Sequence, residues 1–516
     1  MKGEHICKVD KKKSILNVSV SMVCHLATVV MSILVRRVLI RHCGNDVNGL
    51  NALYVSIIGF LAVAELGVGS AITFCMYRPI VEGDDGKVSA LYHLFRRLYL
   101  LIGSIVLVCG LALTPFIHYF AKDYGQLDVN LYTTFILMLL SVVITYLFGA
   151  ELSLINAYKN NYITTAINSG GQLVQYVLQI AALYITGSFE VYLLCRIVAA
   201  LVQWSVTRVV IRKKYAPVLQ HRQKIDVQTR KELVRNIKAM FMHKIGTLLV
   251  NTVDSVVIAA FVGVVALGSY SNYSTIQTAM SGILGLVFSS LVSVLGHLYV
   301  SSSKDVVKKY CEAFHLLNFA LGAVFYLGYY AVADDVIAML FAEELIAEKV
   351  VSAVVALNGF VQFMRRSTIL FRDATGSFYH DRWKPLVEGT VNVILSIVLV
   401  NRIGVTGVIV ATILTNLLIC HIVEPYVLYV HALQTSPGRH YMRNYGMMGL
   451  FVFGMSLVDV FAVKNTSHLI TFCANGFIAV GIALVLLLGI VLLNRNSCQL
   501  LLGAIKRRKT GNLSFV

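Results

Sequence analysis

Two basic side chains, Arg196 and Lys244, lie inside long apolar segments of this sequence. A charged side chain at the centre of a bilayer costs at least about 2.5 to 3.5 kcal/mol on insertion scales, so such residues usually face a hydrated cavity or a partner of opposite charge. No acidic residue lies one helical turn from Arg196. We therefore expect both cations to line a water-filled cavity. The alternative is an ion pair with Glu151 or Asp254, and the sequence favours the two interpretations equally.

Two further arginines, Arg36 and Arg37, end the first apolar segment at the expected outer surface of the membrane. Long basic side chains at such a position commonly anchor a helix by reaching the interface with their charged ends. The alternative function is to contact a charged substrate near the outer leaflet.

Three carboxylates, Glu65, Glu151 and Asp254, also fall within apolar segments. Glu65 comes just before Gly67 and Gly69, where glycine allows the helix backbone to open. We expect these carboxylates to face the cavity, where Glu65 or Asp254 could carry a coupling proton or cation. A structural ion pair is the equally favoured alternative for each of these two.

Composition indicates that a membrane must position these residues. Hydrophobic residues make up 57% and charged residues only 14% of the chain, against about 45 to 50% and about 25% in soluble proteins. A bilayer core of about 30 Å needs about 20 apolar residues per helix, so a chain of 516 residues can supply about 12 to 14 spans. The net charge of +18 is spread between apolar segments, which indicates membrane topology rather than nucleic-acid binding.

The apolar segments predict an all-α membrane protein of about fourteen transmembrane helices, with boundaries uncertain by about 2 to 4 residues. The expected spans are 14–36, 50–77, 97–120, 131–157, 162–185, 188–210, 238–262, 268–299, 313–333, 350–370, 386–401, 405–430, 445–463 and 470–493. With the N-terminus inside, 35 of the 44 Lys and Arg residues fall in cytoplasmic segments and 7 in outer ones. Because cytoplasmic loops retain basic residues, we expect both termini to be cytoplasmic.

The spans form two groups that resemble one another. Each group has a tight outer turn, then a span that opens with Gly and Asn among small residues, at Gly49-Leu50-Asn51 and at Gly268-Ser269-Tyr270-Ser271-Asn272, and then a Lys-rich inner segment. Six helices per group is an even number, so both groups would enter the membrane from the same side, with a substrate path between them. The expected domains are an N-terminal six-helix lobe (1–211), a basic cytoplasmic linker (212–235), a C-terminal six-helix lobe (236–433) and two extra helices with a basic cytoplasmic tail (434–516).

Six stretches carry a resemblance to a known family, and they occur in the family's order along nearly the whole chain. They are 49–72, 77–91, 243–263, 267–273, 371–413 and 424–431. On these stretches the chain resembles the polysaccharide transporter family, which includes the Wzx-like oligosaccharide flippases, of the multidrug/oligosaccharidyl-lipid/polysaccharide exporter superfamily. The resemblance implies two six-helix lobes around a V-shaped cavity that opens to alternate leaflets, with two extra C-terminal helices.

The family resemblance also implies a function and a location. Members move sugar repeat units on a polyprenyl diphosphate from the inner to the outer leaflet of the cytoplasmic membrane, for capsule, O-antigen or exopolysaccharide assembly. The expected partners are this lipid-linked oligosaccharide, membrane lipid, and a glycan polymerase with other assembly proteins, but no nucleic acid. Phosphate favours Arg and Lys, and the planar fork of Arg can donate two hydrogen bonds to it. Arg196, Lys244, Arg36 and Arg37 are therefore the expected cations for diphosphate or sugar contacts. No cofactor is expected beyond a coupling H⁺ or Na⁺.

Three other functions remain open. A cation-coupled multidrug exporter of the same superfamily would need an acidic cavity, whereas here cations are as numerous as carboxylates. A membrane glycan polymerase or acyltransferase would need a nucleophile with a paired base, a metal cluster or a sizeable outer loop, and the sequence predicts none of these. A structural scaffold or channel is the third alternative. We therefore expect a transporter rather than an enzyme, with no catalytic residues and no metal ligands.

Overall fold

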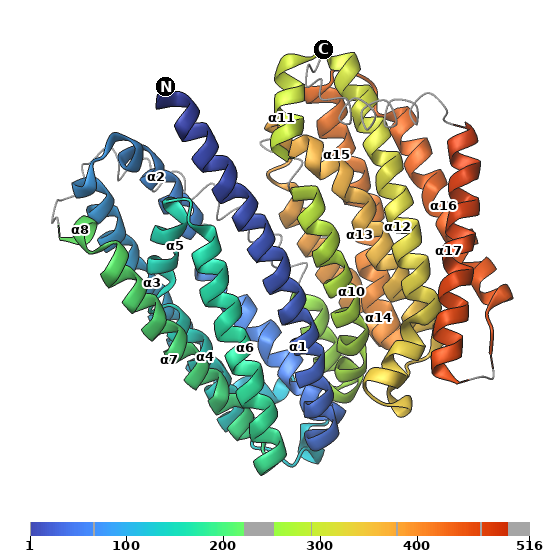
Figure 1. The fold of residues 1–516 in the computed structure, drawn as a ribbon. Helices are drawn as coiled ribbons and strands as arrows, with labels where there is room; N and C mark the ends of the chain where they lie inside the picture. The colour runs from blue at the N-terminus through green and yellow to red at the C-terminus, as the bar shows by residue number, and fades with distance from the viewer. Residues whose placement is uncertain are drawn as a thin grey trace. The chain divides into compact units, whose positions relative to one another are not determined.

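The computed structural model describes residues 2–65, 68–220, 252–289, 292–377, 380–464 and 467–493, and these residues form helices joined by short turns (Figure 1). They divide into two compact units, Met1–Gly268 and Ser269–Val516, with the boundary inside α10 (Val264–Ser289). The all-α membrane class that the sequence predicts is confirmed. The predicted linker lies largely within 221–251, outside the described residues, so the lobe boundaries at 211 and 236 stay predictions.

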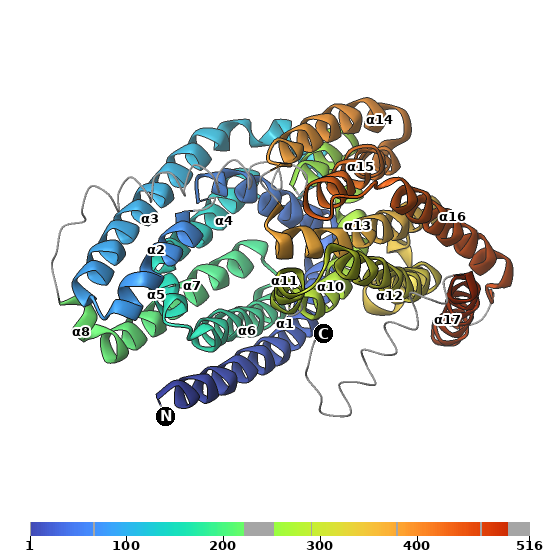
Figure 2. The ribbon, with the colours of Figure 1, turned by 90° about the horizontal axis from the view of Figure 1, so that it is seen from above.

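The first unit is built from α1 to α8 and the chain that leads into α10. Its helices are α1 (Lys2–Leu61), α2 (Val68–Glu82), α3 (Asp85–Leu113), α4 (Leu131–Thr145), α5 (Gly149–Ala157), α6 (Asn161–Thr186), α7 (Phe189–Lys214) and α8 (Ala216–Leu219), with a short 3₁₀ turn at Ala62–Glu65 and a π turn at Ile258–Val262. α1 packs on α6, and α7 packs on both α6 and α4 (Figure 2).

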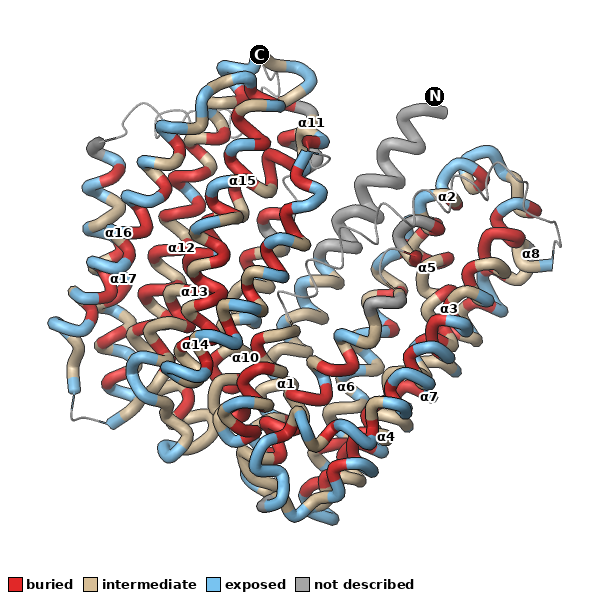
Figure 3. Tube along the Cα trace, turned by 180° about the vertical axis from the view of Figure 1, so that it is seen from behind, coloured by how far each residue is buried: buried red, intermediate tan, exposed pale blue. Residues whose placement is uncertain are grey.

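The second unit is built around α12 and α13. Its further helices are α11 (Val292–Ser301), α12 (Lys304–Leu340), α13 (Lys349–Thr375), α14 (Lys384–Thr415), α15 (His421–Tyr426), α16 (Gly438–Phe461) and α17 (His468–Leu493), with π turns at Asn416–Cys420 and Val427–Ala432. Buried residues concentrate along α12 and α13 (Figure 3). Phe360 on α13 stacks on Phe451 of α16 with the ring centroids 3.7 Å apart, so the two extra C-terminal helices belong to this core.

Polar side chains cap the starts of two helices, and a glycine ends a third. Asn130 accepts hydrogen bonds from the backbone of Tyr132 and Thr133 at the start of α4. Asp84 accepts from the backbone N–H of Lys87 at the start of α3, and this bond lowers the pKa of the Asp84 carboxyl. Gly187 ends α6 with φ 62°, a left-handed conformation that glycine adopts without strain. These caps satisfy backbone groups that a membrane interior cannot hydrate.

Eight helical stretches of the described chain are long and apolar enough to cross a membrane, so this is a multi-pass membrane protein. They run Ser19–Leu61, Asp85–Tyr119, Leu131–Ala157, Phe189–Lys214, Lys304–Leu340, Lys384–Ala432, Gly438–Phe461 and His468–Val491. The first and the sixth stretch each cover two predicted spans. Three more predicted spans are present as α6, α10 with α11, and α13. The seventh, 238–262, lies mostly outside the described residues.

The first predicted span is longer than expected. The sequence places its end at Arg36, whereas α1 continues as helix until Gly44, where φ 92° and ψ 165° break the helical path. Arg36 therefore lies two turns before the break and not at the helix end. Two neighbouring arginines suggested a boundary because charge usually marks the membrane surface, but the helix-breaking glycine decides the geometry.

Gly49 and Gly268 open corresponding predicted spans of the two groups. Within the first unit, the backbone at Gly49 packs closely against the backbone from Val264 to Gly268. A Cβ atom on Gly49 would overlap the carbonyl oxygen of Val264 and lie 2.8 Å from the backbone nitrogen of Gly268. The side chain of Asn48 donates to the carbonyl of Gly268 at 3.4 Å, and that of Asn45 donates to the carbonyl of Val265 at 3.2 Å. Small residues here allow two helix backbones to approach closely, as at many membrane helix interfaces.

A substitution at Gly49 tests whether the close backbone contact with Val264 and Gly268 stabilises the protein. Gly49→Ala is expected to destabilise the protein by about 1 to 3 kcal/mol, because the added methyl group meets rigid backbone rather than a flexible side chain. The thermal unfolding midpoint of the purified protein in detergent would measure the loss. The matched control is Gly170→Ala on α6, where an added Cβ meets nothing within 4 Å. Equal midpoints for the two variants would show that the Gly49 contact is not needed.

Candidate substrate-binding site

Three helices of the first unit bring two of the predicted cations, Arg36 and Arg196, to the same pair of tyrosines. Arg36 comes from α1, Tyr176 from α6, and Tyr192 and Arg196 from α7. Both guanidinium groups lie near the hydroxyl groups of both tyrosines. The α6–α7 turn at Gly187 makes these helices antiparallel neighbours, and α1 packs on α6, so residues distant in the sequence meet at one level.

The surroundings of Arg196 are aromatic rather than acidic. Tyr192 is one turn before Arg196 and is 5% exposed, while Arg36, Tyr176 and Arg196 are each half-buried. Within the described chain Arg196 forms no ion pair with a carboxylate. Neutral phenol groups beside a guanidinium do not neutralise it, so its positive charge can attract an anion. We call Arg36, Tyr176, Tyr192 and Arg196 the arginine–tyrosine cluster.

Glu151, one of the alternative partners for Arg196, interacts elsewhere. Its fully buried Oε1 accepts from the Tyr92 hydroxyl at 3.1 Å and lies 3.9 Å from Nε of Arg208. The Arg208 guanidinium also lies 5.6 Å from the ring centre of Trp204. The Arg208 contact joins α5 to α7, so Glu151 has a structural environment away from the arginine–tyrosine cluster.

Glu65 lies at the end of the 3₁₀ turn after α1. The Tyr99 hydroxyl donates to Glu65 Oε1 at 2.5 Å, and Tyr146 also hydrogen-bonds the carboxylate. Tyr99 is held in place because Gly69 and Gly149 leave room for its ring. No described cation forms an ion pair with Glu65. Two phenol donors and no cation leave the carboxylate able to bind a proton or a small cation.

The other sequence-predicted site residues are less informative. Asp254 is buried, with 8% exposure, in the segment that ends the described part of the first unit. Arg37 is exposed on α1. Lys244 lies outside the described residues. The assignment of these residues to the site stays a prediction.

A buried ionic network in the second unit was missed in the sequence. Arg365 on α13 donates through Nε and Nη2 to both oxygens of Glu424 on α15, at 3.2 and 2.6 Å. Its Nη1 lies 3.3 Å from Glu388 of α14 and donates to Asn416 at 2.5 Å. Lys384 bridges Glu388 and Glu424 at 3.0 and 2.5 Å. Two cations and two carboxylates thus balance at the junction of α13, α14 and α15, which suits a structural role.

The turn between α13 and α14 carries a second ionic group. Arg372 donates to Asp381 at 2.6 Å and to Asp373 at 3.0 Å, and both Arg372 and Asp381 are buried. The basic residues of 365–384 predict a cytoplasmic segment, in which charges need no buried partner. The signal available was Glu424, an acidic residue inside an apolar stretch, which requires a buried cation elsewhere.

Each unit has an ion pair between its fourth and sixth predicted spans, and the acidic and basic residues are exchanged between the two units. Glu151 belongs to the fourth predicted span and Arg208 to the sixth, whereas Arg365 and Glu424 belong to the fourth and sixth spans of the second group. Coulomb attraction is unchanged when both charges are exchanged, so one helix arrangement can carry either order. If the predicted repeat holds, the two pairs lie at corresponding positions of the two groups.

The long apolar helices define a polytopic membrane protein. A family model described as "Polysaccharide biosynthesis protein" matches residues 14–298, more than half of the sequence. The chain belongs to this family, and the sequence-based resemblance is confirmed. No curated protein matches the chain.

Solved structures with a similar fold are transporters of the MOP superfamily. An inward-facing multidrug resistance MATE family transporter matches with a TM-score of 0.61 and 13% identity, over 84% of this chain and 99% of that one. The lipid II flippase MurJ in an inward closed conformation matches with a TM-score of 0.58 and 12% identity, over 92% and 99%. A MOP superfamily transporter from Pyrococcus furiosus matches with a TM-score of 0.52 and 12% identity, over 82% and 96%. At these identities the likeness concerns the fold.

The network predicts a strong dependence of stability on Glu424. Glu424→Gln leaves Arg365 and Lys384 with a single carboxylate, and removing one partner of a buried pair typically costs about 3 to 5 kcal/mol. A lower thermal unfolding midpoint of the purified protein is the expected result. The exposed Glu344 gives the control variant Glu344→Gln. Adding Lys384→Met to Glu424→Gln restores the charge balance and should recover part of the loss; a double variant less stable than Glu424→Gln would contradict the role of charge balance.

Proposed function

We propose that this chain is a flippase that moves polyprenyl-diphosphate-linked oligosaccharide repeat units from the inner to the outer leaflet of the cytoplasmic membrane. The observation that carries the proposal is the arginine–tyrosine cluster, in which Arg196 has no carboxylate partner among the described residues. Membership of a polysaccharide biosynthesis family supports a glycan-bearing substrate. The fold shared with a lipid II flippase supports a lipid-linked one.

The chemistry of such a substrate matches the cluster. A diphosphate presents several oxygens, and two guanidinium groups can each donate to a pair of them. Phenol hydroxyls donate to or accept from sugar hydroxyls, while aromatic faces pack on the apolar faces of sugar rings. The polyprenyl tail remains in lipid, so only the headgroup needs a polar path.

A multidrug exporter is less well supported by the same residues. Binding a lipophilic cation calls for an accessible carboxylate without a nearby positive charge. Glu65 meets this requirement, but Glu151 interacts with Arg208, and in the second unit Glu388 and Glu424 interact with Arg365 and Lys384. Resistance to cationic drugs conferred by this chain would favour that alternative.

The direct test replaces Arg196. In a strain whose surface glycan depends on this chain, Arg196→Gln is expected to reduce surface glycan at least about tenfold, because one charge-assisted hydrogen-bond partner of the diphosphate is lost. Lipid-linked repeat units should accumulate in the membrane, which distinguishes failed flipping from failed synthesis. Arg196→Lys keeps the charge but loses the fork, so an intermediate effect is expected.

The control for this test is Arg212→Gln, which removes an exposed charge from the end of the same helix. Its glycan output should match the unaltered protein. Membrane level is measured for every variant. Full surface glycan from an Arg36→Gln, Arg196→Gln double variant at normal level would remove the cluster from the transport path.

We also propose that Glu65 binds the coupling ion, H⁺ or Na⁺. Glu65→Gln keeps the Tyr99 contact possible but removes the charge, so transport should lose its response to an imposed proton or sodium gradient. Translocation of lipid-linked oligosaccharide in reconstituted vesicles, with each gradient applied separately, measures this response. Glu344→Gln, an exposed carboxylate variant, should retain it. A Glu65→Gln protein that still responds to either gradient would exclude Glu65 as the coupling site.

A further inference from the structure

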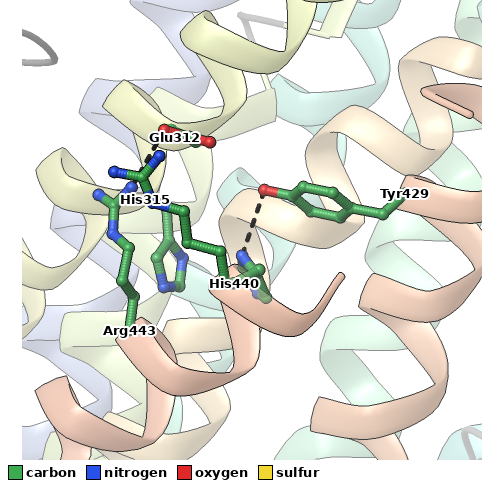
Figure 4. A pocket seen from close by; sticks show the side chains of 6 residues that line it. Glu312, His315, Tyr429, His440 and Arg443 are labelled. Carbon is green, nitrogen blue, oxygen red and sulfur yellow. Dashed lines mark hydrogen bonds and ion pairs between the residues drawn. The ribbon is translucent and has the colours of Figure 1, made fainter. Parts of the chain in front are cut away.

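A small cavity lies inside the second unit where α16 packs against α12 and the π turn after α15 (Figure 4). Its lining residues are Glu312, His315, Tyr429, Arg439, His440 and Arg443. The empty volume is about 200 Å³ including the open mouth. The enclosed part has room for about one water molecule or one oxygen atom.

Arg443 is half satisfied at this cavity. Its Nη1 donates to Glu312 at 3.2 Å, whereas Nε and Nη2 are buried and have no hydrogen-bond partner within the described chain. Nε and Nη2 form one edge of the guanidinium fork, and this edge matches two oxygens of a carboxylate or phosphate. Arg365 shows the completed arrangement, because the same edge there holds Glu424. The free edge of Arg443 therefore has the geometry of an oxyanion site.

Histidines add to the donors around this edge. His315 is 2% exposed, and its Nδ1 lies 3.0 Å from the Ser367 hydroxyl. When Ser367 donates to Nδ1, the other ring nitrogen carries the proton, and this buried Nε2 has no partner in the part of the chain described here. The His440 ring centre lies 4.5 Å from that of His315 with the rings tilted, and His440 Nδ1 lies 3.4 Å from the Tyr429 hydroxyl. Buried donors without partners cost about 1 to 3 kcal/mol each, so a ligand that accepts from them is favoured.

Charge and position identify the ligand class. Arg439 and Arg443 outnumber the single carboxylate of Glu312, which leaves a net positive cavity. Arg439 is exposed in the first turn of α16, and Met442 beside it is 76% exposed. A basic residue next to an exposed apolar one is typical of the boundary between headgroups and acyl chains. The predicted topology assigns this end of α16 to the cytoplasmic leaflet, where anionic lipids attract basic residues.

We propose that this cavity binds the phosphate group of an anionic membrane phospholipid, with one phosphate oxygen entering the enclosed part. Nε and Nη2 of Arg443 donate to the phosphate, His315 Nε2 donates to the inserted oxygen, and Arg439 contacts the headgroup from the rim. The bound lipid would fasten α16 to α12. This site lies in the second unit and does not depend on the proposed transport function.

Two measurements on the full-length protein test the site and separate the sources of phosphate. Native mass spectrometry compares retention of phosphatidylglycerol with that of phosphatidylcholine, and thermal unfolding in detergent is followed during titration with inorganic phosphate. Arg443→Gln and Arg443→Lys are each expected to retain phosphatidylglycerol about tenfold less well than the unaltered protein, because the fork is lost in both. The matched control, Lys309→Gln, removes an exposed charge from the same end of α12 and should change neither measurement.

A third variant keeps the test valid if Arg443 is also needed for folding. Glu312→Gln leaves the fork in place and removes the competing carboxylate, so it should tighten phosphatidylglycerol retention. Saturable stabilisation by inorganic phosphate that depends on Arg443, without lipid selectivity, would overturn the lipid source. Retention and phosphate response equal to those of Lys309→Gln in all three variants would overturn the site.

Discussion

The requirement that every charge inside the membrane be balanced by another charge or by a polar ligand governs this structure. The second unit meets it internally, because Arg365, Lys384, Glu388 and Glu424 balance within hydrogen-bonding distance at the meeting point of three helices. The first unit meets it only in part. Glu151 lies near Arg208, but Arg196 lies near two tyrosines and forms no ion pair with a carboxylate among the described residues. Neutral phenols leave the charge of the guanidinium uncompensated, and this distinguishes Arg196 from the paired cations of the second unit.

The two predicted groups of spans carry charge pairs that can be compared. The fourth and sixth spans of each group are joined by one acid–base pair, with the signs exchanged between the groups, so the helix arrangement needs the attraction and not a particular order of residues. Arg196 has no such counterpart. Arg196 lies twelve residues before Arg208, and the residue twelve before Glu424 is Thr412, which accepts a hydrogen bond from Asn392 at 2.9 Å. A cation present in only one of two equivalent helices is not required by the fold, and this favours a role in binding.

Periodicity and hydropathy predicted the helices well, since long apolar segments have few alternatives in a membrane. They could not predict which helices meet. In the sequence, the pair Arg36 and Arg37 indicates the end of a span. The packing of α1 on α6 instead places Arg36 near Tyr176. The sequence predicts that Arg365 is a cytoplasmic loop cation. Its partner Glu424 is 59 residues away, so the pair is not visible from neighbouring residues. Charge pairs between distant segments depend on tertiary contacts, whereas the isolation of Arg196 within its own helix was visible from the neighbouring residues alone.

The requirement for balanced charges also applies at the periphery of the second unit, where Arg443 lies. The guanidinium groups of Arg365 and Arg443 both come from helices of one core, and both are largely buried, with 14% and 15% side-chain exposure. In Arg365 every edge of the fork has a carboxylate or amide oxygen, whereas in Arg443 one edge faces a cavity that opens beside an exposed arginine. A buried fork without acceptors is costly at either place, so the difference lies in what can reach it. The interior network must be completed by the chain itself, while a site at the headgroup boundary can be completed by the membrane.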